Sequence, residues 1–226
     1  MLILLNQLNE SMRAKLLFLW WRVWHLRNNI IFGDGKCGKK PTQELILRKE
    51  FMACIPSEIW KYPSPGWAKL NSDASFIESN GTGSWGAILR NERGEVMITA
   101  WGPLPHCINA GTAEALGLLN GVRAILPMYA GRIRIENDNA SLINELNLNV
   151  RSKSAIADIA QDIKNLLSSF EEAICGKVNR SANKVADVLA RLGRSVSSEC
   201  LLLGSAPPCV AEALMHDCKL LEPLSM

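Results

Sequence analysis

Between Gly66 and Gly193, stretches with the hydrophobic period of a strand and stretches with that of a helix follow one another in a defined order. This order constrains the fold of the chain more than any other feature of its sequence. Stretches that alternate between apolar and polar residues predict strands, and stretches with apolar residues three and four apart predict helices. The run from Asn91 to Gly94 predicts a tight turn between two strands, and Pro127 predicts a helix end. The predicted elements are strands at 67–76, 84–90, 95–101, 132–136 and 173–178, and helices at 113–126, 139–147, 154–169 and 183–192.

The resulting order, βββαβααβα, predicts an α/β domain with a mixed five-stranded sheet, its first three strands antiparallel, flanked by helices. We expect this domain to span residues 60–195. Residues 1–59 are predicted to form a Trp-rich helical extension and a linker, because apolar residues recur at helical spacing from Leu16 to Ile30 and Gly and Pro follow. Residues 196–226 form a predicted C-terminal tail, which either docks on the domain or stays loose.

The composition excludes several classes of protein. The chain has 226 residues, 48% of them hydrophobic, and its net charge of +3 permits a nucleic-acid partner without arguing for one. Its seven cysteines are widely spaced and include no CxxC pair, which favours neither a disulfide framework nor a zinc site. No segment reaches about 18 apolar residues, the length of a membrane span, and the start is too short an apolar run for a signal peptide. We therefore expect an intracellular protein with reduced thiols, in the nucleus, the cytosol or an organelle.

Four acidic residues occupy positions from which their carboxylates can meet in one site. Asp73 ends an alternating stretch, Glu114 lies in the first turn of the first predicted helix, Asp138 follows the fourth strand, and Asp187 lies on the last helix. Carboxylates gathered without Lys or Arg repel one another unless cations neutralise them, and hard oxygen ligands select Mg²⁺ or Mn²⁺. Two such ions can activate water and stabilise the leaving oxygen in phosphodiester cleavage.

Each acid taken alone also has an ordinary structural interpretation. Asp73 suits a turn at a strand end, and Glu114 suits the positive end of a helix dipole. Asp138 suits the cap of the next helix, and Asp187 suits a solvated helix face. Glu136 shares a strand face with Asp138 and is an alternative ligand. Four coincidences in one order are much less expected than one shared site.

Five motifs in this order resemble type 1 ribonuclease H, and most closely the plant ribonuclease H-like domains related to non-LTR retrotransposons. The segment from Leu19 to Phe32 resembles the helix that trails the zinc-binding-like segment of retroelement reverse transcriptases, here as a relic without that segment's cysteines and histidines. The motifs cover roughly residues 60–195 and are Pro65–Ala74, Gly83–Gly94, Ala113–Ala115, Ile135–Asp138 and Arg180–Ala190.

The resemblance implies hydrolysis of the RNA strand of an RNA–DNA hybrid with two Mg²⁺ or Mn²⁺ ions. It implies that Asp73 contacts both ions and that the other three acids, Glu114, Asp138 and Asp187, complete the ligand set. For the nucleic acid we expect phosphate contacts from Arg180 and Lys184, which flank the last helix. Asn71, on the same strand face as Asp73, is expected to support it or to contact sugar hydroxyls.

Two departures from the family pattern keep an alternative open. The first motif reads Asp73-Ala74 where the family usually has Asp-Gly, and the loop before Asp187 carries Arg180 and no histidine. The loop histidine of efficient relatives is thought to aid proton transfer and product release. The alternatives to a hybrid ribonuclease are therefore a weak or inactive nucleic-acid-binding module derived from a retrotransposon, or a relic without activity. Protein partners stay open, a monomer among the possibilities.

Overall fold

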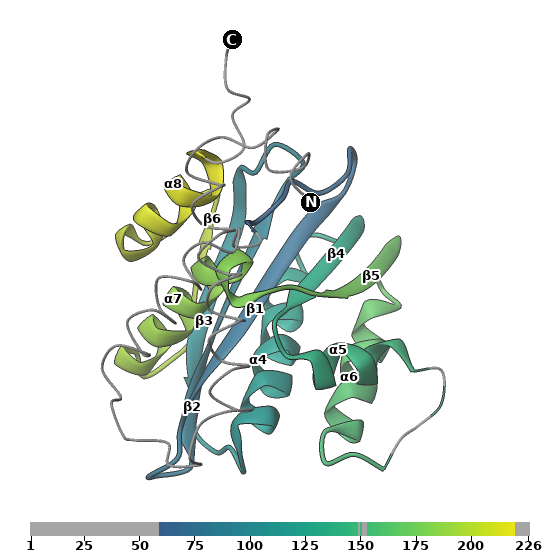
Figure 1. Cartoon of the computed structure of the whole chain (residues 1–226), viewed down its shortest axis with the longest axis vertical. Helices are drawn as coiled ribbons and strands as arrows, with labels where there is room; N and C mark the ends of the chain where they lie inside the picture. The colour runs from purple at the N-terminus through teal and green to yellow at the C-terminus, as the bar shows by residue number, and fades with distance from the viewer. Residues whose placement is uncertain (1–58, 149, 151–152, 220–226) are drawn as a thin grey trace, which may run out of the picture. The chain divides into compact units, whose positions relative to one another are not determined.

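The computed structural model describes residues 59–148, 150 and 153–219, so the predicted N-terminal extension lies, apart from Ile59, outside the described residues. Most elements lie within a few residues of the predicted bounds. Figure 1 shows how they are arranged. In the described residues, no helix is both long and apolar enough to cross a membrane. The strands are β1 (Ala68–Ile77), β2 (Thr82–Arg90), β3 (Val96–Leu104), β4 (Arg132–Asn137), β5 (Glu172–Lys177) and β6 (Cys200–Leu203). The helices are α4 (Ala110–Ile125), α5 (Ala140–Asn147), α6 (Ala157–Leu167), α7 (Lys184–Leu192) and α8 (Ala211–Lys219), with short 3-10 turns η1 (Arg180–Ala182), η2 (Gly193–Ser195) and η3 (Pro208–Val210).

The strands form one mixed sheet in the order β5-β4-β1-β2-β3-β6. Neighbours from β1 to β3 pair antiparallel, and β4 pairs parallel with both β1 and β5, which confirms the predicted α/β class. The predicted count of five strands is wrong by one, because β6 pairs antiparallel with β3 at the sheet edge. This strand is a run of four residues with no alternation, so its period carries no signal.

Helices α4 and α7 cover opposite faces of the sheet. A Cβ atom added at Gly117 of α4 would lie 3.2 Å from the Cβ of Ala74, whereas one added at Gly86 would meet the backbone of α7. Gly86 pairs with Asp73, the strand neighbour of Ala74, and neighbouring residues of a strand point to opposite faces. Each face carries its own apolar core, one with Leu70, Trp85, Leu118, Val122 and Ile135 and the other with Ile88, Trp101, Val185, Leu189 and Val210.

The segment after residue 195 packs on the α7 face, so the sheet extends beyond the predicted limit of the domain. Val210 and Ala213 are buried in the apolar core of that face. Arg90, fully buried on β2, forms a 2.7 Å ion pair with Asp217 of α8. The Trp60 ring stacks on the Arg90 guanidinium at 3.6 Å, so the chain leading into the domain and the end of α8 meet the same side chain. Within the segment described from the sequence as a tail, β6 pairs with β3, and Val210, Ala213 and Asp217 contact the rest of the domain.

Gly86 sets how closely α7 approaches the sheet. A Cβ atom there would overlap the backbone nitrogen of Ala190 and lie 2.5 Å from the carbonyl carbon of Leu189. Backbone atoms of a packed helix cannot yield as a flexible side chain does, so any side chain at this position would displace the helix. The absence of a side chain at Gly86 thus brings the helix that carries Asp187 down beside Asp73.

Gly86→Ala should therefore lower the free energy of unfolding by about 2 kcal/mol or more. Gly111→Ala is the matched control, because a Cβ there meets only the Asn109 side chain, at 3.3 Å, and alanine suits a helix. Urea unfolding of the two variants checks this packing. Equal stabilities would contradict the close approach of α7.

Candidate functional site

The candidate site lies where β1 and β4 separate. The parallel pairing of the two strands runs to Asn71 and Glu136, and Asp73 and Asp138 each lie two residues further along. The carboxyl ends of neighbouring parallel strands border a crevice that commonly holds ligands. Glu114 enters from α4, which begins three residues earlier than predicted because Asn109 caps it by accepting a hydrogen bond from the Thr112 N–H. The prediction of Glu114 in the first turn is wrong: it lies in the second turn.

The structure brings together three of the four predicted acids. One carboxylate oxygen each of Asp73, Glu114 and Asp138 lies within 4.8 Å of the other two. Asp187 is outside this group, although its charge acts on Asp73. Instead, both carboxylate oxygens of Asp187 accept hydrogen bonds from the Arg191 guanidinium, one helical turn further on, at 2.7 and 3.0 Å. Three of the four predicted carboxylates thus lie together in the structure, and Asp187 is not in their group.

Burial and mutual repulsion make the cluster costly to ionise. Burial, followed by the charges of Glu114, Asp138 and Asp187, raises the pKa of Asp73 to about 8. Burial and then the charge of Asp138 raise the pKa of Glu114 to about 7, against a hydrogen bond from Asn137 that lowers it. In the described part of the chain, neither Asp73 nor Glu114 has a Lys or Arg partner. Such a site favours either protons or a divalent cation.

Two arginines neutralise the outer acids. The Arg180 Nε lies 3.1 Å from the Asp138 Oδ2, and its side chain is 94% exposed. Arg191 forms the ion pair with Asp187 described above. Exposed ion pairs of this kind contribute little to stability and exchange readily with solvent ions. Asp138 and Asp187, the outer acids, are therefore paired only weakly, whereas Asp73 and Glu114, the inner acids, form no ion pair with the residues that the structure describes.

A cavity of about 350 Å³ adjoins the cluster. Its lining includes Glu114 and Asp138, together with Lys177, the last residue of β5, and Arg180 of η1. The first turn of α4 also lines it and contains no acidic residue. Lys184, the other predicted phosphate contact, is exposed on the first turn of α7 and does not line this cavity. The lining thus includes two acidic and two basic residues, which suits an anionic ligand bound beside a cation.

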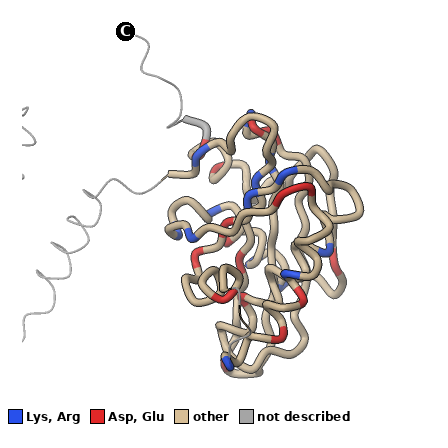
Figure 2. The backbone as a smooth tube through the Cα atoms, turned by 90° about the vertical axis from the view of Figure 1, so that its right-hand side faces the viewer, with Lys and Arg blue, Asp and Glu red and all other residues tan. Residues whose placement is uncertain are grey.

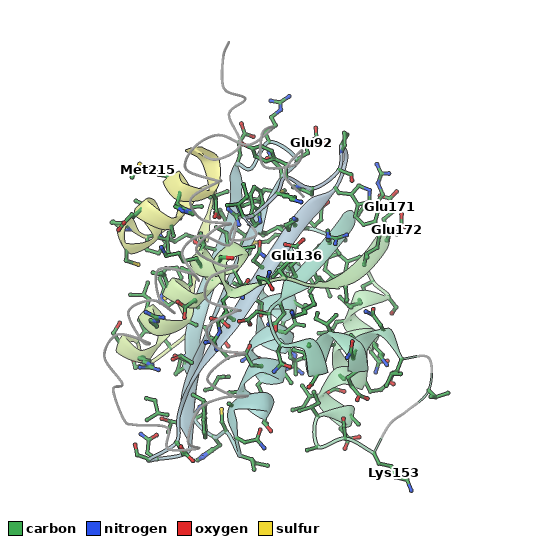
Figure 3. All side chains as sticks on the ribbon, in the orientation of Figure 1. Glu92, Glu136, Lys153, Glu171, Glu172 and Met215 are labelled. Carbon is green, nitrogen blue, oxygen red and sulfur yellow. The ribbon has the colours of Figure 1, made fainter. Side chains whose placement is uncertain are left out.

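The structure places Asn71 away from any surface, so a contact with nucleic acid does not fit it. Asn71 is 0% exposed and accepts hydrogen bonds from the Trp60 indole and from Arg90. Glu136 is also excluded as a ligand of the cluster, because it is buried in a 2.8 Å ion pair with Lys69. Figure 3 shows Glu136 over the middle of the sheet, in contrast to Glu171 and Glu172 at the β5 edge. Strand alternation alone therefore cannot show that Asn71 and Glu136 lie outside the carboxylate cluster while Asp73 lies in it.

The alanine that departs from the Asp-Gly motif leaves β1 regular. Ala74 pairs with Trp85 in the continuous register of β1 and β2. No residue other than glycine has positive φ in the described chain. The Ala74 methyl group fits because Gly117 faces it from α4. The departure is thus accommodated by packing and does not displace Asp73.

Two asparagines of the site were not among the predicted residues. Asn137 and Asn183 both donate a side-chain hydrogen bond to the carbonyl oxygen of Ser72, each at 2.9 Å. They belong to two of the quoted motifs, but an asparagine before an acid or at a helix start suits a turn or a cap equally well. Only the three-dimensional structure shows that they meet at one atom.

The raised pKa values of Asp73 and Glu114 predict a pH dependence of stability without metal. Their unfolded values lie near 4, so between about pH 5 and pH 8 the folded protein holds protons that the unfolded chain has released, and stability falls as pH rises. In a chelator, the free energy of unfolding should be on the order of 2 kcal/mol lower at about pH 8.5 than at about pH 5.5. Asp73→Asn should flatten this slope, and Asp162→Asn, an exposed acid on α6, should keep it. Urea unfolding across pH checks this, and parallel profiles of wild type and Asp73→Asn would contradict it.

Comparisons with known proteins agree with this fold. A family model described as reverse transcriptase-like matches residues 71–193, which is just over half of the chain. No curated protein matches the sequence. Ribonuclease H1 of the archaeon Halobacterium salinarum aligns with a TM-score of 0.52 at 17% identity, over 57% of this chain and 98% of that one. The N-terminal ribonuclease H domain of a Mycobacterium tuberculosis protein, fused to maltose-binding protein, aligns with a TM-score of 0.51 at 17% identity, over 57% and 94%.

A third structure, a type 1 ribonuclease H described as having the type 2 active-site motif, covers more of this chain. It aligns with a TM-score of 0.52 at 15% identity, over 67% of this chain and 86% of its own. Similarity at these identities concerns the fold, and the family match rests on the sequence itself. The chain therefore belongs to the reverse transcriptase-like family and has the ribonuclease H fold.

Proposed function

We propose that this protein hydrolyses the RNA strand of RNA–DNA hybrids at the carboxylate cluster. The observation that carries the proposal is the convergence of Asp73, Glu114 and Asp138 within 4.8 Å, with no basic partner for the inner two in the described residues. The mutual repulsion of these carboxylates destabilises the fold. A bound divalent cation would offset that repulsion, which supports a metal-dependent function for the acids. The motif resemblance points to a plant, retrotransposon-related origin, which is part of the same proposal.

The donor set fits Mg²⁺ or Mn²⁺. All three close ligands are carboxylate oxygens, which hard divalent cations prefer, and the cluster includes no thiol or imidazole. Asp73, Glu114 and Asp138 would hold two ions, and Asp187 would join them on release from Arg191. The bound ions would activate the attacking water and neutralise the charge that develops on the scissile phosphate and its leaving oxygen.

The chain's own residues would bind and orient the substrate. Lys177 and Arg180 line the cavity beside the cluster and would attract a phosphate of the RNA strand, and the exposed Lys184 would contact a neighbouring one. Water would attack the phosphorus, the bond to the 3′-oxygen would break, and that oxygen would take up a proton. The products would be a 5′-phosphate and a 3′-hydroxyl, and the 2′-OH and groove shape would distinguish RNA from DNA.

One observation favours a second candidate function, nucleic-acid binding without cleavage. Arg180 forms an ion pair with Asp138, and Arg191 forms one with Asp187. Two of the four acids thus already have a positively charged side chain as partner. The loop that carries Arg180 has no histidine to take part in proton transfer. Basic and acidic positions are interspersed along the backbone (Figure 2), so the binding surface would be local to this loop and α7.

A cleavage assay with a labelled hybrid separates the two functions. The wild type should cut the RNA strand slowly, require Mg²⁺ or Mn²⁺, and leave duplex DNA intact. Asp73→Asn should lose more than about a hundredfold in turnover, because an amide cannot replace an anionic ligand and even outer partners of a metal are worth 10- to 100-fold. Hybrid binding should persist, since Arg180 and Lys184 are unchanged. Glu172→Gln, an exposed acid on β5, is the matched control and should cleave as wild type.

Equal cleavage by wild type and Asp73→Asn would show that the activity is a contaminant and would contradict the proposal. Binding of the hybrid by both proteins with cleavage by neither would support the binding module instead.

A further inference from the structure

Asn183 stands at the N-cap of α7 but does not cap the helix. An asparagine at this position usually accepts a hydrogen bond from a backbone N–H of the first turn. Here no side-chain cap bond forms, and the Asn183 Nδ2 instead donates to the carbonyl oxygen of Ser72 on β1, at 2.9 Å. The side chain is 2% exposed, so water does not compete for this bond. The helix forgoes its cap, and the asparagine connects α7 with β1.

Asn137 reaches the same oxygen from the end of β4. Its Nδ2 lies 2.9 Å from the Ser72 oxygen and 3.4 Å from the Glu114 Oε2. Its Oδ1 accepts a hydrogen bond from the Asn139 N–H at 2.8 Å, which fixes the orientation of the amide. Asn137 is fully buried, and every polar atom of its side chain has a partner within the site. One side chain therefore connects β1, β4 and α4.

The Ser72 carbonyl is the point where backbone pairing between β1 and β4 has just ended. The parallel register stops at Asn71 and Glu136, one residue before Ser72. The two asparagine amides donate to this carbonyl beyond the end of that pairing. Because the peptide unit is planar, holding the Ser72 oxygen also holds the nitrogen and Cα of Asp73. The backbone from which the central carboxylate projects is thus fixed from two sides.

We propose that Asn137 and Asn183 are positioning residues, which hold Asp73 in register with Glu114, Asp138 and the α7 helix for metal binding and hydrolysis. The inference rests on the proposed function of the same site. Asp73, Glu114 and Asp138 repel one another when ionised, so the elements that carry them need ties that resist separation. Neutral amide donors supply such ties without adding a cation that would compete with the metal.

A purely structural role is the competing explanation, because buried polar groups are usually hydrogen-bonded for stability alone. The two roles differ in what a substitution changes. Loss of a structural bond lowers the free energy of unfolding and leaves the folded molecules with a normal site. Loss of a positioning bond also weakens metal binding and turnover in molecules that remain folded.

The experiment compares full-length Asn137→Ala, Asn183→Ala and the double variant with Asn91→Ala. Asn91 is the matched control, because its side chain accepts two backbone hydrogen bonds in the β2–β3 turn, remote from the cluster. Mn²⁺ affinity is measured by titration calorimetry without nucleic acid, and kcat and KM are measured with the labelled hybrid. Asn183→Leu, which keeps the number and branching of the side-chain heavy atoms but removes the donor, replaces Asn183→Ala if the alanine variant does not fold.

We expect each site variant to lose about 10- to 100-fold in Mn²⁺ affinity and in kcat, as partners of metal ligands typically do. KM should change little, because Arg180 and Lys184 are untouched. The double variant should lose less than the product of the single losses, since both amides act through one carbonyl oxygen. Asn91→Ala should lose stability only.

Mn²⁺ affinity and kcat within about twofold of Asn91→Ala would overturn the positioning role and leave the proposed function standing. Failure of both Asn183 variants to fold would show a structural role and would also overturn it. A wild type that neither binds Mn²⁺ nor cleaves would instead overturn the proposed function, and this inference with it.

Discussion

Repulsion among the clustered carboxylates is the interaction on which the rest of this structure depends. Asp73 is only 8% exposed and has two other acids within 4.8 Å, so neither water nor a basic side chain of the described chain offsets its charge. The fold opposes this repulsion with close backbone packing and neutral hydrogen bonds. Gly86 lets α7 lie against β2, and Asn137 and Asn183 bind the backbone just before Asp73. Close packing and hydrogen bonds thus hold the backbone around Asp73, as a preorganised site for a small hard cation requires.

The charges around the cluster are graded from the inside outward. Asp73 and Glu114 have no basic partner in the described residues, and their pKa values are raised to about 8 and about 7. The outer acids, Asp138 and Asp187, each have an exposed arginine. Under the proposed function, an incoming phosphate would pair with these arginines, and the outer carboxylates would then be released. Two other buried ion pairs, Lys69 with Glu136 and Arg90 with Asp217, take no part in the cluster.

Much of the fold could be predicted from the sequence, because each central strand and helix has its own hydrophobic period and clear breakers. Asp73, Glu114 and Asp138 could be placed together through the order of the motifs. Strand β6 could not be predicted, because its four residues have no hydrophobic period of their own and become a strand by pairing with the edge of β3. Asn71 is buried beside Trp60 and Arg90, which both donate hydrogen bonds to it. These residues are distant from it in sequence, so no local sequence pattern predicts the contacts. Asn183 reads as a helix cap, and its actual partner, Ser72, lies more than a hundred residues away.

The central claim is that the carboxylates of Asp73, Glu114 and Asp138 form a divalent-cation site. Its most direct test is a crystal structure of the full chain grown with Mn²⁺, with an anomalous difference map recorded at the manganese edge. We expect anomalous peaks between Asp73, Glu114 and Asp138, with the carboxylate oxygens as ligands. Crystals that bind Mn²⁺ only elsewhere, with these three carboxylates free of any peak, would contradict the claim.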